Sequence, residues 1–322
     1  MERTTAKKNK YEIDMCNGTI MDKLISFSLP LMLSGILQLM FNAVDIIVVG
    51  RFSGSQALAA VGSTSALINV FTNLFIGISL GANVLTARFY AAGREKEVSE
   101  TVHTAITLAL VSGIIMALVG LVFSRGALAL MGTPDDVIGL SALYMRIYFL
   151  GMPFFMLYNY GAAILRAVGD TKRPLLFLMI AGVINACLNM VLVIVFKLGV
   201  AGVAIATVIS QMISCVLVLR CLCRSESSYR LRFSELGMKG YYLKQIFSVG
   251  VPAGIQSTVI NFSNVLLQSS VNSFGSTAMA GYTAANNLLG FLYVSVNSIT
   301  QACMSFTSQN YGVGKLKRMD RV

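Results

Sequence analysis

The sequence predicts an all-α membrane protein, and three observations lead to this fold class. Apolar side chains make up 56% of the 322 residues and charged side chains only 12%, which is too little charge for the surface of a soluble globular protein. Apolar runs of about 18 residues or more recur along the whole chain, and as helices they could cross a hydrocarbon core about 30 Å thick. These runs lack the alternation of apolar and polar residues that marks a membrane-spanning barrel.

Charged residues, glycine and proline divide the apolar runs into eight predicted spans. Their approximate ranges are 24–50, 56–87, 103–124, 138–165, 174–196, 201–222, 244–273 and 278–310. Several are longer than the roughly 20 residues that a span needs, so we expect tilted helices or ends that project from the bilayer. The polar, basic first residues lead into a full-length span, and we expect no cleavable signal peptide.

Lysine and arginine are concentrated in alternate connections between the spans. Of the 25 basic residues, 21 lie in the N-terminal segment and in the loops after every second span; the other side has only Arg51, Arg125, Arg146 and Lys197. The positive-inside rule therefore places both ends of the chain in the cytoplasm and predicts an even number of spans. Because these loops account for the positive net charge, we expect no nucleic-acid partner.

Three short segments recur along the chain in one register. Segments 25–30, 54–59 and 90–94 return as 246–252, 275–280 and 311–315, at offsets of 221 or 222 residues. Six spans separate the copies, so the repeat is parallel. We expect a cytoplasmic segment at 1–23, a six-helix lobe at 24–222, a cytoplasmic linker at 223–243, and two spans of a second lobe at 244–322. Two full copies would need about 440 residues and twelve spans, so we expect a truncated form.

Asp45 is the one acidic residue that falls inside an apolar span, whereas the other thirteen lie in loops or at span ends. An intramembrane carboxylate is costly and is expected to face the bundle interior or a water-filled cavity. Such a group is suited to bind and release a proton or a cation. The alternative is an interfacial aspartate that bonds a neighbouring helix, because Asp45 lies on the order of 8 Å from the outer end of its span.

Helical rise identifies polar residues that could lie at the depth of Asp45. Asn189 in the fifth span and Thr207 in the sixth lie about 12 Å and 8 Å below the same surface. Asn185 precedes Asn189 by one turn and shares its helix face. We expect Asp45, Asn185, Asn189 and Thr207 to form a cation-binding group in the outer half of the first lobe. Hydrogen bonding between helices is the alternative for each partner.

The second and eighth spans occupy equivalent places in the two copies and carry further polar residues. Helix packing would explain these residues as well as a central cavity would: Asn69, Asn73, Asn83, Asn286, Asn287, Asn297 and Gln301. For His103, at the cytoplasmic start of the third span, we expect a structural role. The chain has no Walker loop, nucleophile elbow or second intramembrane carboxylate, so we expect neither an enzyme nor a bound cofactor.

Four motifs together resemble the multidrug and toxic compound extrusion (MATE) family over essentially the whole chain. They are Pro30 followed by Asp45, the Val-Gly-Arg exit at 49–51, LRAVGDTKRP at 165–174, and GVAGVAIATVISQ at 199–211. The resemblance implies two pseudo-repeated six-helix lobes, of which this chain would hold one complete lobe and two helices of the second. It also implies exchange of a cation for small organic, often cationic, compounds.

The resemblance is strongest to the DinF-like branch of the family. In that branch the first-span aspartate binds the coupling cation with an asparagine and an aspartate on the fifth span and a threonine on the sixth. Asp45, Asn185 and Thr207 match these positions, but Asn189 replaces the second aspartate. A single carboxylate favours protonation of Asp45, or weak Na⁺ binding there, over a two-carboxylate site. The glutamate that the NorM-like branch has on the seventh span corresponds to Ile260.

From these features and the resemblance we expect a secondary antiporter in the bacterial inner membrane that exports organic or cationic drugs by alternating access and is coupled to H⁺ or Na⁺. We expect it to be a monomer whose partners are small organic substrates and membrane lipid. One alternative is a lipid-linked oligosaccharide flippase of the same superfamily, which would need a strongly cationic cavity that the spans do not provide. The other alternative is a fragment that does not transport.

Overall fold

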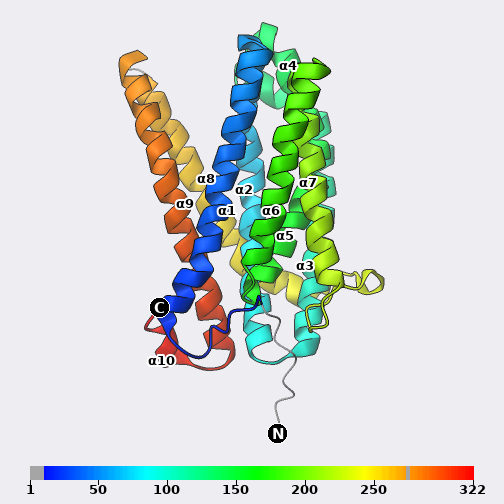
Figure 1. Cartoon of the computed structure of the whole chain (residues 1–322), viewed down its shortest axis with the longest axis vertical. Coiled ribbons are helices and arrows are strands. Elements are labelled where there is room, and N and C mark those ends of the chain that lie inside the picture. Colours follow the sequence, from blue (N-terminus) through cyan, green and yellow to red (C-terminus); the bar gives the residue numbers. More distant parts are fainter. Residues whose placement is uncertain (1–10, 273–275) are drawn as a thin grey trace.

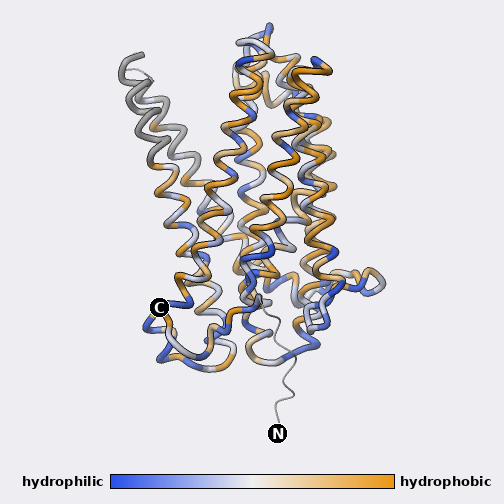
Figure 2. Tube along the Cα trace, in the orientation of Figure 1, coloured by the Kyte–Doolittle hydropathy of each residue, from blue (hydrophilic) through white to orange (hydrophobic). Residues whose placement is uncertain are grey.

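The computed structural model describes residues 11–272 and 276–322, without side-chain description at positions 63, 66, 70 and most of 261–288. All regular elements in the described part of the chain are helices, which confirms the predicted fold class. Figure 1 shows them running roughly side by side along the long axis. In Figure 2, apolar residues predominate along the middle of α1, α6 and α7, and hydrophilic residues gather at the lower end.

Long helices occupy the eight predicted spans in order. They are α1 (Ile20–Phe52), α2 (Ser55–Ala91), α3 (Glu95–Leu130), α4 (Asp135–Leu150) with α5 (Met152–Ala167), α6 (Lys172–Asn189) continued by the π-helix η1 (Met190–Val195), α7 (Gly199–Cys223), α8 (Gly240–Asn272) and α9 (Ser276–Gly312). A short 3-10 helix, η2 (Phe233–Glu235), lies between α7 and α8, and α10 (Leu316–Met319) follows α9. We refer to α1–α7 as the first lobe.

Five helical segments among the described residues are long and apolar enough to cross a membrane: α1, α2, α3, α6 with η1, and α7. The α4–α5 pair makes a sixth span if it is counted as one. With 33 and 37 residues, α8 and α9 stand where the seventh and eighth spans were predicted. The chain is therefore a multi-pass membrane protein.

The fourth predicted span, 138–165, is not one helix as expected but two, bent by 48° at Gly151. Pro153 follows in the first turn of α5, and proline has no N–H to donate to the carbonyl one turn earlier, which favours a bend at this point. The bend packs against α3, where a Cβ on Gly113 would lie 2.5 Å from the Cα of Pro153. This part of the first lobe is therefore held by backbone contact.

Glycines also bring α2 and α8 into backbone contact. A Cβ on Gly77 would lie 2.2 Å from the Cα of Gly254, and a Cβ on Gly81 would lie 2.2 Å from the carbonyl oxygen of Ile246. Small residues at such crossings let membrane helices approach closely without large side chains between them. The first half of α8 is therefore packed tightly on α2.

Polar side chains join α9 to the first lobe near the lower end in Figure 1. Asn83 donates from Nδ2 to the carbonyl of Ala163 (2.8 Å) and accepts from the hydroxyl of Ser305 (3.1 Å). Gln309 donates from Nε2 to the carbonyl of Ala167 (2.7 Å). These buried hydrogen bonds span α2, α5 and α9. They therefore connect α9 to the first lobe.

His103, near the start of α3, holds the segment between α7 and α8. Its Nδ1 donates to the carbonyl of Ser99 (2.7 Å), which leaves Nε2 to accept the N–H of Arg232 (3.1 Å). The ring is almost fully buried. The structure therefore gives His103 the structural role that was expected.

Candidate functional site

The candidate site forms where α1 crosses α6 inside the first lobe. Gly182 of α6 makes this crossing close, because a Cβ there would lie 1.8 Å from the ring of Phe41 on α1. Asp45 follows Phe41 by one turn on α1. Asn185 and Asn189 follow Gly182 on α6 by three and seven residues, so they share its face. Contact between Phe41 and Gly182 thus sets Asp45 opposite the two asparagines.

A chain of hydrogen bonds connects the four predicted cation-binding residues. Asn189 donates from Nδ2 to Oδ1 of Asp45 and to Oδ1 of Asn185, the latter at 3.1 Å. Asn185 in turn donates from Nδ2 to Oγ1 of Thr207 (3.4 Å) and, more weakly, to Oγ of Ser210 (3.5 Å). The structure therefore brings Asp45, Asn185, Asn189 and Thr207 together. Only Asn189 bonds the carboxylate directly; Thr207 is connected through Asn185.

Asp45 and its hydrogen-bonded partners are buried, and one acceptor atom among them has no donor. Asp45 is 9% exposed, and Asn189 is fully buried. Among the described residues, Oδ1 of Asn189 has no hydrogen-bond partner. A buried acceptor without a partner costs about 1–3 kcal/mol, and a nearby cation or the O–H of a protonated carboxyl would satisfy it. The arrangement can therefore hold a proton or a small cation beside Asp45.

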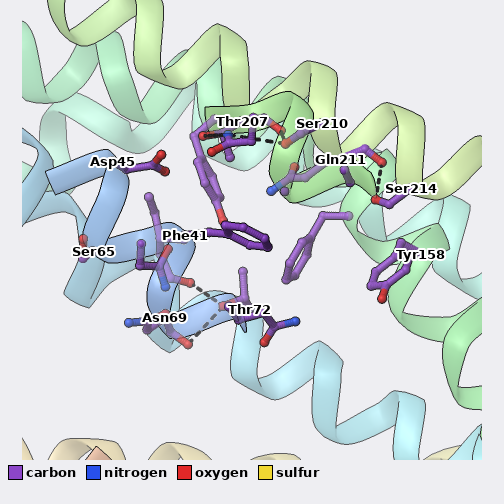
Figure 3. A pocket seen from close by; sticks show the side chains of 18 of the residues that line it. Phe41, Asp45, Ser65, Asn69, Thr72, Tyr158, Thr207, Ser210, Gln211 and Ser214 are labelled. Carbon is purple, nitrogen blue, oxygen red and sulfur yellow. Dashed lines mark hydrogen bonds between the residues drawn. The ribbon is translucent and has the colours of Figure 1, made fainter. Parts of the chain in front are cut away.

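Asp45 faces a cavity of about 560 Å³ in the first lobe. Figure 3 shows Asp45 and Phe41 of α1 on one side, Thr207, Ser210 and Gln211 on another wall, and Asn69 and Thr72 of α2 along the base. Residues from α1, α2, α4, α5, α6 and α7 contribute to the lining: Gln38, Phe41, Asn42, Asp45, Ile46, Val61, Ser65, Ile68, Asn69, Thr72, Asn73, Ile76, Tyr144, Tyr148, Phe155, Tyr158, Asn159, Leu178, Ala181, Gly182, Asn185, Thr207, Ser210, Gln211 and Ser214.

The lining combines aromatic rings and neutral amides around a single charge. Tyr144 and Tyr148 of α4 stack with ring centroids 6.0 Å apart and planes 29° apart. Phe41, Phe155 and Tyr158 add further rings. Asp45 is the one carboxylate of the described lining, which contains neither lysine nor arginine. The cavity is therefore electrically suited to a cation and not to an anion.

The polar residues that were predicted to line a cavity lie in different places in the structure. Asn69 and Asn73 line the first-lobe cavity. The side chains of Asn286 and Asn287 lie outside the described residues. Gln301 is half buried on α9 and does not contribute to this cavity. Asn83 is used in packing, through its bonds to Ala163 and Ser305.

Several lining residues escaped the sequence reasoning, although a signal was present. Gln38, Asn42 and Asp45 are spaced by four and three residues, which places them on one face of α1. Thr207, Gln211 and Ser214 repeat this spacing on α7. A search for polar residues at helical spacing around Asp45 would have found both walls. The π-helix η1, which begins one residue after Asn189, had no such signal.

Comparison with known proteins identifies the family. The model of the MatE family matches residues 30–191 and 252–322. The two matched segments begin at Pro30 and Pro252, the same two prolines that anchor the internal repeat.

Two curated relatives match nearly the whole chain. The chain is 35% identical over 305 residues to the "Probable multidrug resistance protein YoeA" of Bacillus subtilis (strain 168), covering 92% of this chain and 65% of YoeA. It is 23% identical over 301 residues to the "Multidrug export protein MepA" of Staphylococcus aureus (strain NCTC 8325 / PS 47), covering 92% of this chain and 66% of MepA. The chain thus spans about two thirds of the length of these relatives.

Solved structures share the fold. One, described as the outward-facing conformation of a multidrug resistance MATE family transporter of the MOP superfamily, superposes with a TM-score of 0.90 at 22% identity, covering 98% of this chain and 70% of that one. A MATE in the bent conformation gives a TM-score of 0.88 at 22% identity, over 95% and 69% of the two chains. Because the family model matches well over half of its residues, the chain belongs to the MatE family.

Proposed function

We propose that this chain acts in the export of organic cations coupled to H⁺ or Na⁺, with Asp45 as the ion-binding residue and the first-lobe cavity as the substrate site. One observation carries the proposal: the lone carboxylate of Asp45, held by Asn189 beside an unpartnered amide oxygen, on the wall of a cavity with no described lysine or arginine. The names of YoeA and MepA, a multidrug resistance and a multidrug export protein, support it.

The composition of the cavity suggests the class of substrate. Stacked rings such as Tyr144 and Tyr148 attract a delocalised organic cation through their faces and offer flat apolar surface. Side-chain amides, among them Gln38 and Asn42, can donate to or accept from polar groups on different compounds. Asp45 neutralises the positive charge. A site of this kind favours lipophilic cations over neutral or anionic compounds.

Competition for Asp45 provides the coupling. When a proton or Na⁺ binds Asp45, the charge that holds the organic cation is neutralised, so the substrate is released. By linkage, a bound organic cation weakens binding of the ion by the same factor. The amide of Asn189 can serve both states, because it can donate to the carboxylate or accept from its O–H after rotation. Alternating access, with the lower end in Figure 1 on the cytoplasmic side, would make this exchange vectorial.

The flippase alternative has less support. A lipid-linked oligosaccharide carries anionic phosphates, which need cationic partners in the cavity. The described lining offers the carboxylate of Asp45 and no basic residue, so it would repel such a headgroup. A chain that does not transport would still fold this way, and the experiment below separates that alternative by its ligand binding.

Binding of tetraphenylphosphonium to the purified chain in detergent tests the proposal. Asp45→Asn should weaken the affinity at least about tenfold, because it removes the charge opposite the bound cation. The matched control is Asp22→Asn, which neutralises an exposed aspartate in the first turn of the same helix and should bind like the wild type. Equal affinity of wild type and Asp45→Asn would refute the assignment. In cells that carry the chain, Asp45→Asn should also abolish any resistance to this cation.

A further inference from the structure

Residues 11–19, which precede α1, do not project into solvent. In Figure 1 they run across the lower end of the molecule, from the first lobe toward α9 and α10, before the chain enters α1. Met15, in the middle of this segment, is fully buried against Phe27 of α1 and Phe306 of α9. The segment is therefore packed between the first lobe and the helices that follow it.

One end of the segment is anchored to the first lobe. The carboxylate of Glu12 accepts the hydroxyl of Tyr90 on Oε2 (2.7 Å) and that of Tyr229 on Oε1 (2.8 Å). The N–H of Ile13 donates to the carbonyl of Gly169 (3.2 Å). Gly169 has φ +97°, and a Cβ there would lie 2.5 Å from the carbonyl oxygen of Ile13. Glycine at this position is thus needed both for its conformation and for the approach of the segment.

The other end is anchored to α9 and the residues that follow it. Asn310 donates from Nδ2 to the carbonyl of Met15 (3.2 Å). Lys315 donates from Nζ to the carbonyl of Cys16 (2.8 Å) and to Oδ1 of Asn17 (2.8 Å). Arg318 adds longer bonds to the same stretch. Charged donors hold backbone oxygens here, and such bonds are stronger than neutral ones.

The segment between the two anchors is stiffened by Asp14. Its Oδ1 accepts the N–H of Cys16 (3.0 Å) and its Oδ2 accepts Nδ2 of Asn17 (3.0 Å), which forms a local turn. Its carbonyl accepts from Nζ of Lys23 (2.6 Å), on the first turns of α1. A segment tied in this way can transmit a constraint from one anchor to the other, whereas a flexible linker could not.

We propose that residues 11–19 form a strap that fastens α9 and α10 to the first lobe and holds this end of the molecule closed. Between α9 on one side and Tyr90 and Tyr229 on the other, the two anchors act in series, so loss of either one breaks this connection, although the strap stays joined to α1. The strap adds to the direct contacts of α9, such as the Asn83–Ser305 bond. It does not depend on the ion or the substrate proposed above, but any cycle that opens this end must first release the strap.

Native cysteines can report on the strap. Cys303 is half buried on α9, seven residues before Asn310 and so on nearly the same helix face. Cys223, half buried at the end of α7, is a reference on the first lobe. The measurement is the rate of alkylation of each cysteine by a water-soluble maleimide in the purified chain, read by peptide mass spectrometry.

Three variants test the series arrangement. Glu12→Ala cuts the first-lobe anchor, Lys315→Met with Arg318→Met cuts the other anchor, and the third variant combines them. Each cut should raise the alkylation of Cys303 relative to Cys223 about tenfold, because each removes charge-assisted hydrogen bonds. The combined variant should show no further rise, since a strap cut at one end is already released. The described side-chain bonds of Glu12 are to Tyr90 and Tyr229, and none reaches α9 directly.

Lys239→Met is the matched control, because it removes the Lys239–Glu100 ion pair, which involves no strap residue. It should leave Cys303 unchanged. Tyr90→Phe with Tyr229→Phe keeps the two rings and removes both donors to Glu12, so it repeats the first cut with little risk to folding. An unchanged rate at Cys303 in this variant or in Glu12→Ala would overturn the strap. So would effects of the two cuts that multiply in the combined variant, since that indicates independent contacts.

Discussion

Replacing Gly182 by alanine should disturb the site without changing any of its polar groups. The added Cβ would lie 1.8 Å from the Phe41 ring, and ordinary contact begins at 3.4 Å, so ring and helix must separate by about 1.6 Å. The ring can retreat in two ways. It can swing into the cavity that it lines, or α1 can move away from α6 and open the hydrogen bond between Asp45 and Asn189.

Both routes weaken binding of an organic cation, the first by filling its space and the second by displacing its counter-charge. Overpacking of this kind typically costs about 1–3 kcal/mol of stability. The assay is thermal unfolding of the purified chain in detergent, with and without tetraphenylphosphonium. Gly182→Ala should melt several degrees below the wild type and should lose most of the stabilisation that the ligand provides.

Gly139→Ala is the control for this experiment. Gly139 lies inside α4, and a Cβ there would meet no atom within 4 Å. Alanine should therefore be neutral or stabilising by up to about 1 kcal/mol, through helix propensity alone. If Gly182→Ala unfolded and bound the ligand like Gly139→Ala, the close crossing of α1 and α6 would not be what positions Asp45.

Two further predictions concern other carboxylates. Burial raises the pKa of Asp170, between α5 and α6, from 3.8 to about 6, although Arg173 lies beside it. Because the unfolded chain loses this proton at lower pH than the folded chain, wild type should lose stability relative to Asp170→Asn as the pH rises from about 4 to 6. A gain in its melting temperature relative to Asp170→Asn over that range would contradict this prediction. Asn189→Asp would place a second carboxylate at hydrogen-bonding distance from Asp45, where both cannot be charged without a cation. Its melting temperature should rise with NaCl but not with choline chloride; equal responses would argue against a cation position there.

Much of the fold could be predicted because membrane helices need long apolar runs, and such runs are visible in the sequence. The break at Gly151 was missed because the apolar run continues through it, although Pro153 was a local signal. The π-helix η1 has neither proline nor glycine and could not be expected from its residues. The division into lobes at 222/223 stays a prediction, although the family model also matches in two segments.

The centre of the site could be predicted because a buried charge is conspicuous. Helical rise alone placed Asn189 and Thr207 at the depth of Asp45, and the structure brings these residues together. The direct partner of Asp45 could not be derived, since it depends on how closely α1 approaches α6, which the small size of Gly182 decides. The strap could not be predicted from the sequence either. It joins Glu12 to tyrosines at positions 90 and 229, and no local pattern encodes such distant pairs.

Proton release on binding of an organic cation tests the central claim most directly. Tetraphenylphosphonium is titrated into the purified chain by calorimetry in two buffers of different ionisation enthalpy, between pH 5 and 8, and the difference gives the number of protons released per bound cation. We predict that the wild type releases up to one proton at the acid end of this range, that Asp22→Asn matches it, and that Asp45→Asn releases none. Equal proton release by wild type and Asp45→Asn, together with an equal response of cation binding to Na⁺, would contradict the account.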